Sequence, residues 1–93
     1  MNCIDSKCLD KVKENLFAIQ TLLGIDAQID RWWPEDNGII ISITGKLSKS
    51  DLPDRLCRGI KKFYSYILKR ELGEDIRVNC EYDLRNRFEL YIY

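Results

Sequence analysis

The chain has 93 residues, of which 45% are hydrophobic and 32% are charged, as in an ordinary globular domain. Its length corresponds to one domain over residues 1–93 with a single core. Fifteen basic and fifteen acidic residues cancel, so no overall charge attracts nucleic acid or an anionic membrane. The sequence has no apolar run that could span a bilayer and no hydrophobic leader at its start, so we expect a cytoplasmic protein with no membrane contact.

The chain has four cysteines, at positions 3, 8, 57 and 80, and no histidine. A zinc site would need all four thiolates, and since only Cys3 and Cys8 are close in sequence, we expect no metal. Cys57 and Cys80 fall on apolar faces of a predicted helix and a predicted strand. We therefore expect both to be reduced and to pack as small core hydrophobes. A disulfide or a metal at Cys3 and Cys8 stays open.

The first predicted element is a helix over about residues 5–23, followed by Gly24 as a natural C-terminal stop. Its apolar residues recur at three- and four-residue spacing: Leu9, Val12, Leu16, Ile19 and Leu23.

Residues 25–33 alternate between apolar and polar, which predicts a strand with Trp33 on the buried side and Trp32 on the other. Asn37 and Gly38 indicate a turn, because glycine adopts positive φ at little cost. Residues 39–45 are predicted to form a second strand, which completes a hairpin.

Ser48 to Asp51, with Pro53 in the first turn, predicts the start of a second helix that ends near Leu72, before Gly73. Residues 76–82 and 88–93 predict a second hairpin. The buried arc of the second helix is expected to contain Leu56, Ile60, Phe63, Tyr64, Ile67 and Leu68.

The same order of elements occurs twice, in pseudo-repeats over residues 5–45 and 51–93 that are offset by about 49 residues. The predicted fold is α+β: a two-layer sandwich of a duplicated α-β-β unit, with two helices on one face of a four-stranded antiparallel sheet. This is a circularly permuted ferredoxin-like arrangement. The most apolar strands, with Ile41 and Leu90, should lie in the centre, since the other two carry the charges and the proline typical of edges.

Catalysis is not expected. Without histidine the chain has no ready general base near neutral pH and no Cys-His or Ser-His pair. Its five glycines are scattered, so they form no phosphate-binding loop, and its carboxylates fall on predicted edge strands where solvated charges belong. We therefore expect neither an enzyme nor a cofactor.

One side of the second helix carries a row of cations, which we name the basic ridge: Arg55, Arg58, Lys62 and Lys69. Such a row can follow a phosphate backbone, so nucleic-acid binding is the alternative function. An ordinary solvated helix face is the favoured interpretation, because the chain as a whole is neutral.

The open face of the sheet is the leading candidate site. Trp32, Ile40, Tyr91 and Tyr93 are expected to project from it, and Phe17 suggests a second contact on the first helix. Acidic residues expected on the same face would repel phosphate, whereas exposed tyrosine and tryptophan are typical of protein contacts.

We therefore expect a small protein-interaction module that docks through this face or through an edge strand. Its partner would be another protein of unknown identity, with a C2 homodimer as one possibility. An adaptor, an inhibitor, an immunity or antitoxin-like protein and a viral anti-defence protein all fit this description.

Overall fold

The computed structural model describes residues 6–24, 26–45, 52–83 and 87–93. In these ranges the elements follow the predicted order, except that the first helix is divided. The elements are α1 (Ser6–Glu14), α2 (Leu16–Leu23), β1 (Ala27–Glu35), β2 (Gly38–Gly45), α3 (Pro53–Glu71), β3 (Val78–Asp83) and β4 (Arg87–Ile92).

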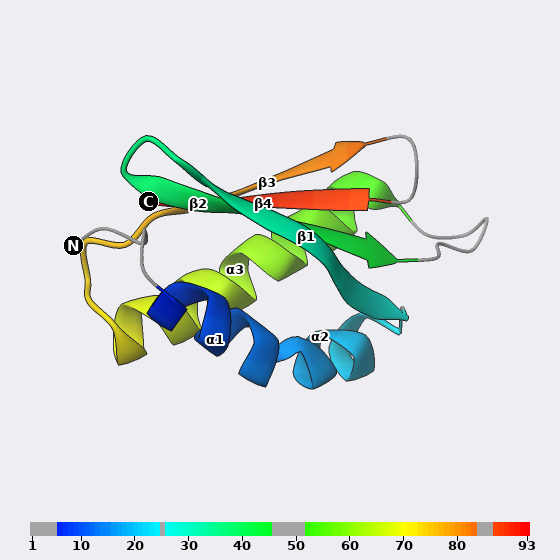
Figure 1. Cartoon of the computed structure of the whole chain (residues 1–93). Helices are drawn as coiled ribbons and strands as arrows, with labels where there is room; N and C mark the ends of the chain where they lie inside the picture. Colours follow the sequence, from blue (N-terminus) through cyan, green and yellow to red (C-terminus); the bar gives the residue numbers. More distant parts are fainter. Residues whose placement is uncertain (1–5, 25, 46–51, 84–86) are drawn as a thin grey trace.

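The strands form one antiparallel sheet in the order β1-β2-β4-β3, which confirms the order predicted from sequence. Ile41 of β2 and Leu90 of β4 are directly paired at its centre, and both are fully buried. The helices lie in a second layer under one face of the sheet (Figure 1). The molecule is therefore an α+β sandwich, and in its described part no helix covers the other, open face of the sheet.

The first predicted helix is broken at Asn15, which separates α1 from α2. The Asn15 side-chain amide donates a hydrogen bond to the Lys11 carbonyl oxygen at 2.8 Å, so it competes with the backbone ladder at this point. The expectation of one continuous helix was wrong for this local reason. Gly24 ends α2 as predicted, with φ of 65° and its N–H donating to the Gln20 carbonyl oxygen at 3.0 Å.

Helix α3 begins at Pro53, in the first turn as predicted, and ends at Glu71, just before Leu72. The capping residues expected at 48–51 lie outside the described residues. In the described part of the chain, no helix is long and apolar enough to cross a membrane.

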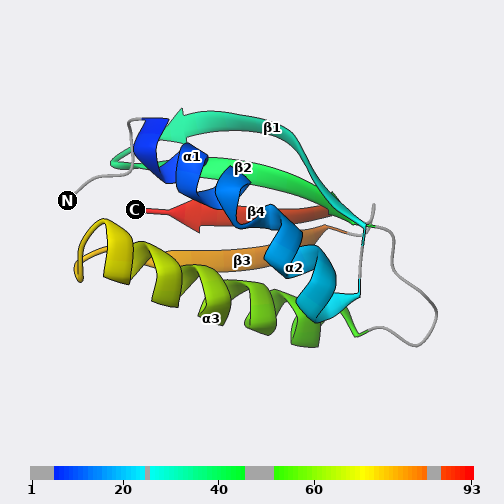
Figure 2. The ribbon, with the colours of Figure 1, turned by 90° about the horizontal axis from the view of Figure 1, so that it is seen from below.

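Tyr64 of α3 joins the helices to each other at the centre of the core. Its ring is fully buried, and its hydroxyl donates to the Val12 carbonyl oxygen of α1 at 3.0 Å. Burial raises the pKa of the Tyr64 phenol, so the group stays neutral and the hydrogen bond persists over the physiological pH range. Helix α3 runs along β3 (Figure 2). Helix α2 contacts both β1 and α3.

The β1–β2 turn places its positive φ at Asp36, with a value of 51°, and not at Gly38 as expected. Gly38 is required for space. A Cβ atom at this position would collide with the carbonyl oxygen of Ile92 and would come within 2.8 Å of the Tyr93 Cβ. A side chain at position 38 would therefore push the C-terminal strand away from β2.

Cys57 of α3 and Cys80 of β3 form a disulfide, with their Cα atoms 5.5 Å apart. The expectation that both are reduced was wrong, although both point into the space between the layers as predicted. Because α3 packs directly on β3, the two apolar faces come within bridging distance. Cys8 is also disulfide-bonded, no described cysteine is a free thiol, and Cys3 lies outside the described residues.

Replacing both residues of this disulfide, Cys57→Ala with Cys80→Ala, should lower the free energy of unfolding by about 3 kcal/mol. The closed loop spans a sequence separation of 23 residues, and opening it restores chain entropy to the unfolded state. Denaturant unfolding followed by circular dichroism measures this difference. A double variant as stable as the parent would show that the disulfide contributes nothing to the fold.

Candidate protein-interaction face

Strand β1 contains a β-bulge. Ile29 pairs with Ile43, but the next paired residue of β1 is Arg31, opposite Ser42, so Asp30 is the extra residue. Because side chains alternate along a strand, one extra residue reverses the faces of everything that follows it.

The bulge exchanges the two tryptophans. Trp33 lies opposite Ile40 on the open face, and Trp32 lies opposite the buried Ile41 on the helix side. The predicted placement of Trp32 on the open face was therefore wrong, and so was that of Trp33 in the core. Trp32 is nevertheless 49% exposed, since β1 is an edge strand and the helix layer does not cover this part of it.

The open face carries an aromatic cluster, which we define as Trp33, Ile40, Tyr91 and Tyr93. Ile40 is paired directly with Tyr91, and the Tyr91 and Tyr93 rings are stacked with centroids 4.6 Å apart. The guanidinium of Arg31 lies 5.4 Å from the Trp33 ring centroid, in reach of a cation–π contact. Ile40, Tyr91 and Tyr93 are thus brought together as predicted, with Trp33 in the place expected for Trp32.

Four exposed charges surround this cluster, and we name them the corner charges: Arg31 and Glu35 on one edge of the sheet, Arg77 and Glu81 on the other. Arg77 directly precedes β3 and extends its ladder, because its N–H donates to the Tyr93 carbonyl oxygen at 2.7 Å. These four charges balance, but the same face also carries Asp30, Asp83 and Glu89 against Arg87, so its anions outnumber its cations and it does not attract a phosphate backbone.

The phenol of Tyr91 has a raised pKa. Desolvation is the largest cause, followed by the negative charges of Asp36 and Glu35 and by the neighbouring Tyr93. The acidic β1–β2 turn therefore lies close enough to act on this hydroxyl. Tyr91 remains a neutral hydrogen-bond donor at physiological pH.

Beside the aromatic cluster is a hollow of about 150 Å³, lined by Ile40, Asn79, Glu81, Glu89 and Tyr91. This volume is well below the roughly 300–1,000 Å³ of sites that hold small organic ligands. The hollow is the size of a single side chain, as expected for a surface that receives another protein.

The open face is polar at the end opposite the aromatic cluster, where β1 begins. The Asp30 carboxylate reaches across β2 to the Arg87 guanidinium of β4, at 3.4 Å. Ser42 lies beneath this region and is fully buried. On the described part of the open face, the apolar surface therefore lies at the end of the sheet that holds the aromatic cluster.

Phe17 is 76% exposed on α2, in the helix layer and away from the open face of the sheet. The structure thus places it apart from the aromatic cluster, and a second contact through it stays a prediction. Tyr66 of α3 is also well exposed and was not singled out from the sequence. It receives a hydrogen bond from Arg70 at 3.4 Å.

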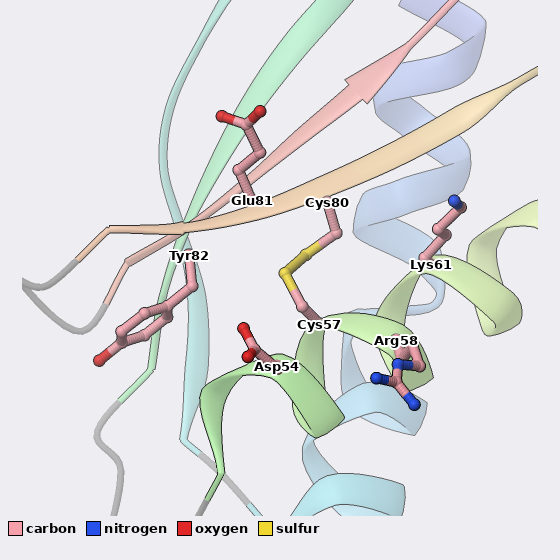
Figure 3. A pocket seen from close by; sticks show the side chains of 7 residues that line it. All are labelled: Asp54, Cys57, Arg58, Lys61, Cys80, Glu81 and Tyr82. Carbon is pink, nitrogen blue, oxygen red and sulfur yellow. A yellow bond between two sulfur atoms is a disulfide. The ribbon is translucent and has the colours of Figure 1, made fainter.

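A groove of about 540 Å³ lies between α3 and β3, with the disulfide among its lining residues (Figure 3). Arg58 and Lys61 line it from α3, and Glu81 lines it from β3. Asp54 completes a balanced set of charges. In the described part of the chain no group of acidic and sulfur ligands could hold a metal ion.

The basic ridge lies on the solvent side of α3. Arg55, Arg58 and Lys62 are exposed, and Lys69 is half-buried. Arg58 shares the disulfide groove with Asp54, so part of the positive charge of this ridge is offset. The predicted residues therefore do share one side of α3, without forming a cavity of their own.

Three residues of this face were not predicted from the sequence: Arg31, Trp33 and Glu35. All three lie after the bulge, and strict alternation assigns such residues to the wrong side. The one available signal is the pair of adjacent tryptophans, one of which must face away from the core whichever phase is chosen.

Comparison of this chain with models of protein families, with curated proteins and with solved structures found no match.

Proposed function

We propose that this chain is a non-catalytic protein-interaction module that docks through the open face of its sheet. The observation that carries this proposal is the aromatic cluster, which the helix layer leaves uncovered. Tyrosine and tryptophan are the residues most enriched among energetically dominant contacts of protein interfaces. An adaptor, an inhibitor, or an immunity, antitoxin-like or anti-defence protein would act in this way.

The face is favoured over an edge strand as the docking element. On β1 the bulge at Asp30 and the proline at position 34 interrupt the regular backbone that an added strand would need. On β3 the solvent-facing positions are polar or charged, and Cys80 ties the strand to α3. Both edges thus carry features that oppose strand addition.

A photo-crosslinking amino acid tests this proposal when it is placed at position 91. Benzoylphenylalanine in place of Tyr91 should cross-link the protein partner in cells, because the ring lies in the aromatic cluster. Benzoylphenylalanine in place of Tyr66 is the matched control, since Tyr66 is an exposed aromatic residue of the helix layer. Mass spectrometry identifies the products.

The expected result is one or a few products from position 91 that position 66 does not give. The same set of products from both positions, or no product from position 91, would contradict docking through this face.

We also infer that the two halves of the chain are repeats of one α-β-β unit in a permuted ferredoxin-like order. The pairing Ile29–Ile43 in the first hairpin corresponds to Val78–Ile92 in the second, at the same offset of about 49 residues. The equivalence is lost after the bulge, for which β3 has no counterpart. The two hairpins thus have the same strand register before the bulge, and this supports a duplicated origin.

The disulfide changes the compartment that we propose. The cytoplasm was expected because the sequence shows no hydrophobic leader and no apolar run that could span a bilayer. A disulfide such as Cys57–Cys80 forms and persists in oxidising environments and is rare in a reducing cytosol. We therefore favour an oxidising compartment for this chain.

Trapping of thiols in intact cells tests the compartment. If cells are treated with an alkylating reagent before lysis, Cys57 and Cys80 should stay unmodified until a reductant is added. Peptide mass spectrometry reports the modification of each residue. Extensive alkylation of both residues before reduction would place the protein in a reducing compartment, as first expected from the sequence.

The alternative, nucleic-acid binding by the basic ridge, has weaker support because acidic residues share the groove at Arg58. We expect no appreciable binding of a fluorescent DNA or RNA oligonucleotide near physiological salt, measured by anisotropy. Arg58→Glu with Lys62→Glu should leave this result unchanged. Micromolar or tighter binding that weakens steeply with salt and disappears in the double variant would promote the alternative.

A further inference from the structure

We infer that the partner that fits the open face is a second copy of this chain, packed face to face about a twofold axis. This inference rests on the proposed function, because it names the partner of the same surface. It is carried by the charge pattern of the face, which is complementary to itself.

The register of the sheet arranges the open-face residues in rows across the strands. One row contains Glu35, Gly38, Tyr93 and Arg77, and the next contains Trp33, Ile40, Tyr91 and Asn79. The rows that follow contain Arg31, Ser42, Glu89 and Glu81, and then Gln28, Thr44, Arg87 and Asp83. In the first and third rows the charges at the two ends are opposite in sign.

A twofold axis parallel to the strands, between β2 and β4, sets each residue opposite its counterpart at the other end of the same row. Arg31 then faces Glu81 of the second copy, and Glu35 faces Arg77. Each corner charge therefore meets a charge of opposite sign on the second copy, and each of the two kinds of pair occurs twice in the dimer. In the polar fourth row Asp83 meets Gln28, so no row sets two like charges opposite each other.

The centre of the face is complementary under the same axis. Ile40 faces Tyr91 of the second copy and Trp33 faces Asn79, so the two aromatic clusters meet at the centre of the sheet. Gly38 faces Tyr93, and the missing side chain leaves room for the ring. The apolar surface is thus removed from water in the middle while the charges pair at the rim, as in known interfaces.

A twofold axis across the strands would also pair the corner charges, with Arg31 against Glu35. That axis sets the carboxylate of Glu89 against the ring of Tyr93, whereas the axis parallel to the strands sets it over the position of Ser42, away from that ring. The parallel axis is therefore favoured. In either orientation the strands of the two sheets stay roughly aligned, as usual in face-to-face packing.

The size of the face sets the expected affinity. Four strands at about 4.8 Å spacing, and about six residues at 3.3 Å, give a flat area of roughly 400 Å² per copy. The two faces together then bury roughly 800 Å², below the roughly 1,200–2,000 Å² of stable specific interfaces, so a weak, transient dimer with a dissociation constant in the micromolar range or above is expected.

Sedimentation velocity of the full chain over a range from about 1 µM to 1 mM tests this inference. The mass should rise from that of the 11.0 kDa monomer to about twice that value. Glu35→Arg should raise the dissociation constant at least about tenfold, because two arginine pairs then face each other. Tyr66→Glu, on the helix layer, is the control that should leave it unchanged.

The charge-swapped double variant fixes the orientation. Glu35→Arg with Arg77→Glu should restore dimerisation if the axis runs parallel to the strands, whereas Glu35→Arg with Arg31→Glu should not. The reverse result would overturn the proposed axis. Circular dichroism checks that each variant is folded, and all the exchanged residues are exposed.

A monomer at every concentration would overturn self-association. If position 91 still cross-links another protein, the proposed function stands and only the second-copy inference fails. If position 91 yields no product and the chain is monomeric, both fail.

Discussion

The β-bulge at Asp30 decides the character of the exposed surface. One extra residue in β1 turns Arg31, Trp33 and Glu35 to the open face and turns Trp32 and Pro34 to the helix side. Without it, strict alternation would set Trp32 opposite Ile40 in place of Trp33, and two of the four corner charges, Arg31 and Glu35, would leave the open face. This single irregularity in the strand therefore decides which tryptophan joins the aromatic cluster, and it sets the alternating charges around that cluster.

The sheet could be predicted from the sequence because its determinants are local. Charges and Pro34 identify the outer strands, and the apolar residues around Ile41 and Leu90 identify the inner ones, which is the observed order. The break at Asn15 was missed because helical periodicity continues through it. The bulge was missed because it is a property of a strand pair: only the spacing of the β2 partners reveals the extra residue in β1.

The disulfide between Cys57 and Cys80 also could not be predicted from the sequence, because it depends on how two elements pack. Their placement on apolar faces was correct, but whether two such faces come within bridging distance depends on how α3 packs on β3. Together with the hydrogen bond from Tyr64 to α1, the disulfide fixes the helix layer beneath the sheet. Because the sheet is held in this way, its open face loses little conformational entropy when a partner binds. A preorganised surface therefore binds at lower entropic cost.

If the open face pairs with itself as proposed, the aromatic cluster cannot contact a second copy and a different protein at once, so the two associations compete. With a micromolar dimer, the fraction of free faces depends on the concentration of the chain itself. Binding of a heterologous protein would then draw monomers from the dimer. The alternating corner charges would favour partners that carry the complementary charge pattern. Other proteins would bind more weakly, because like charges would then lie opposite each other.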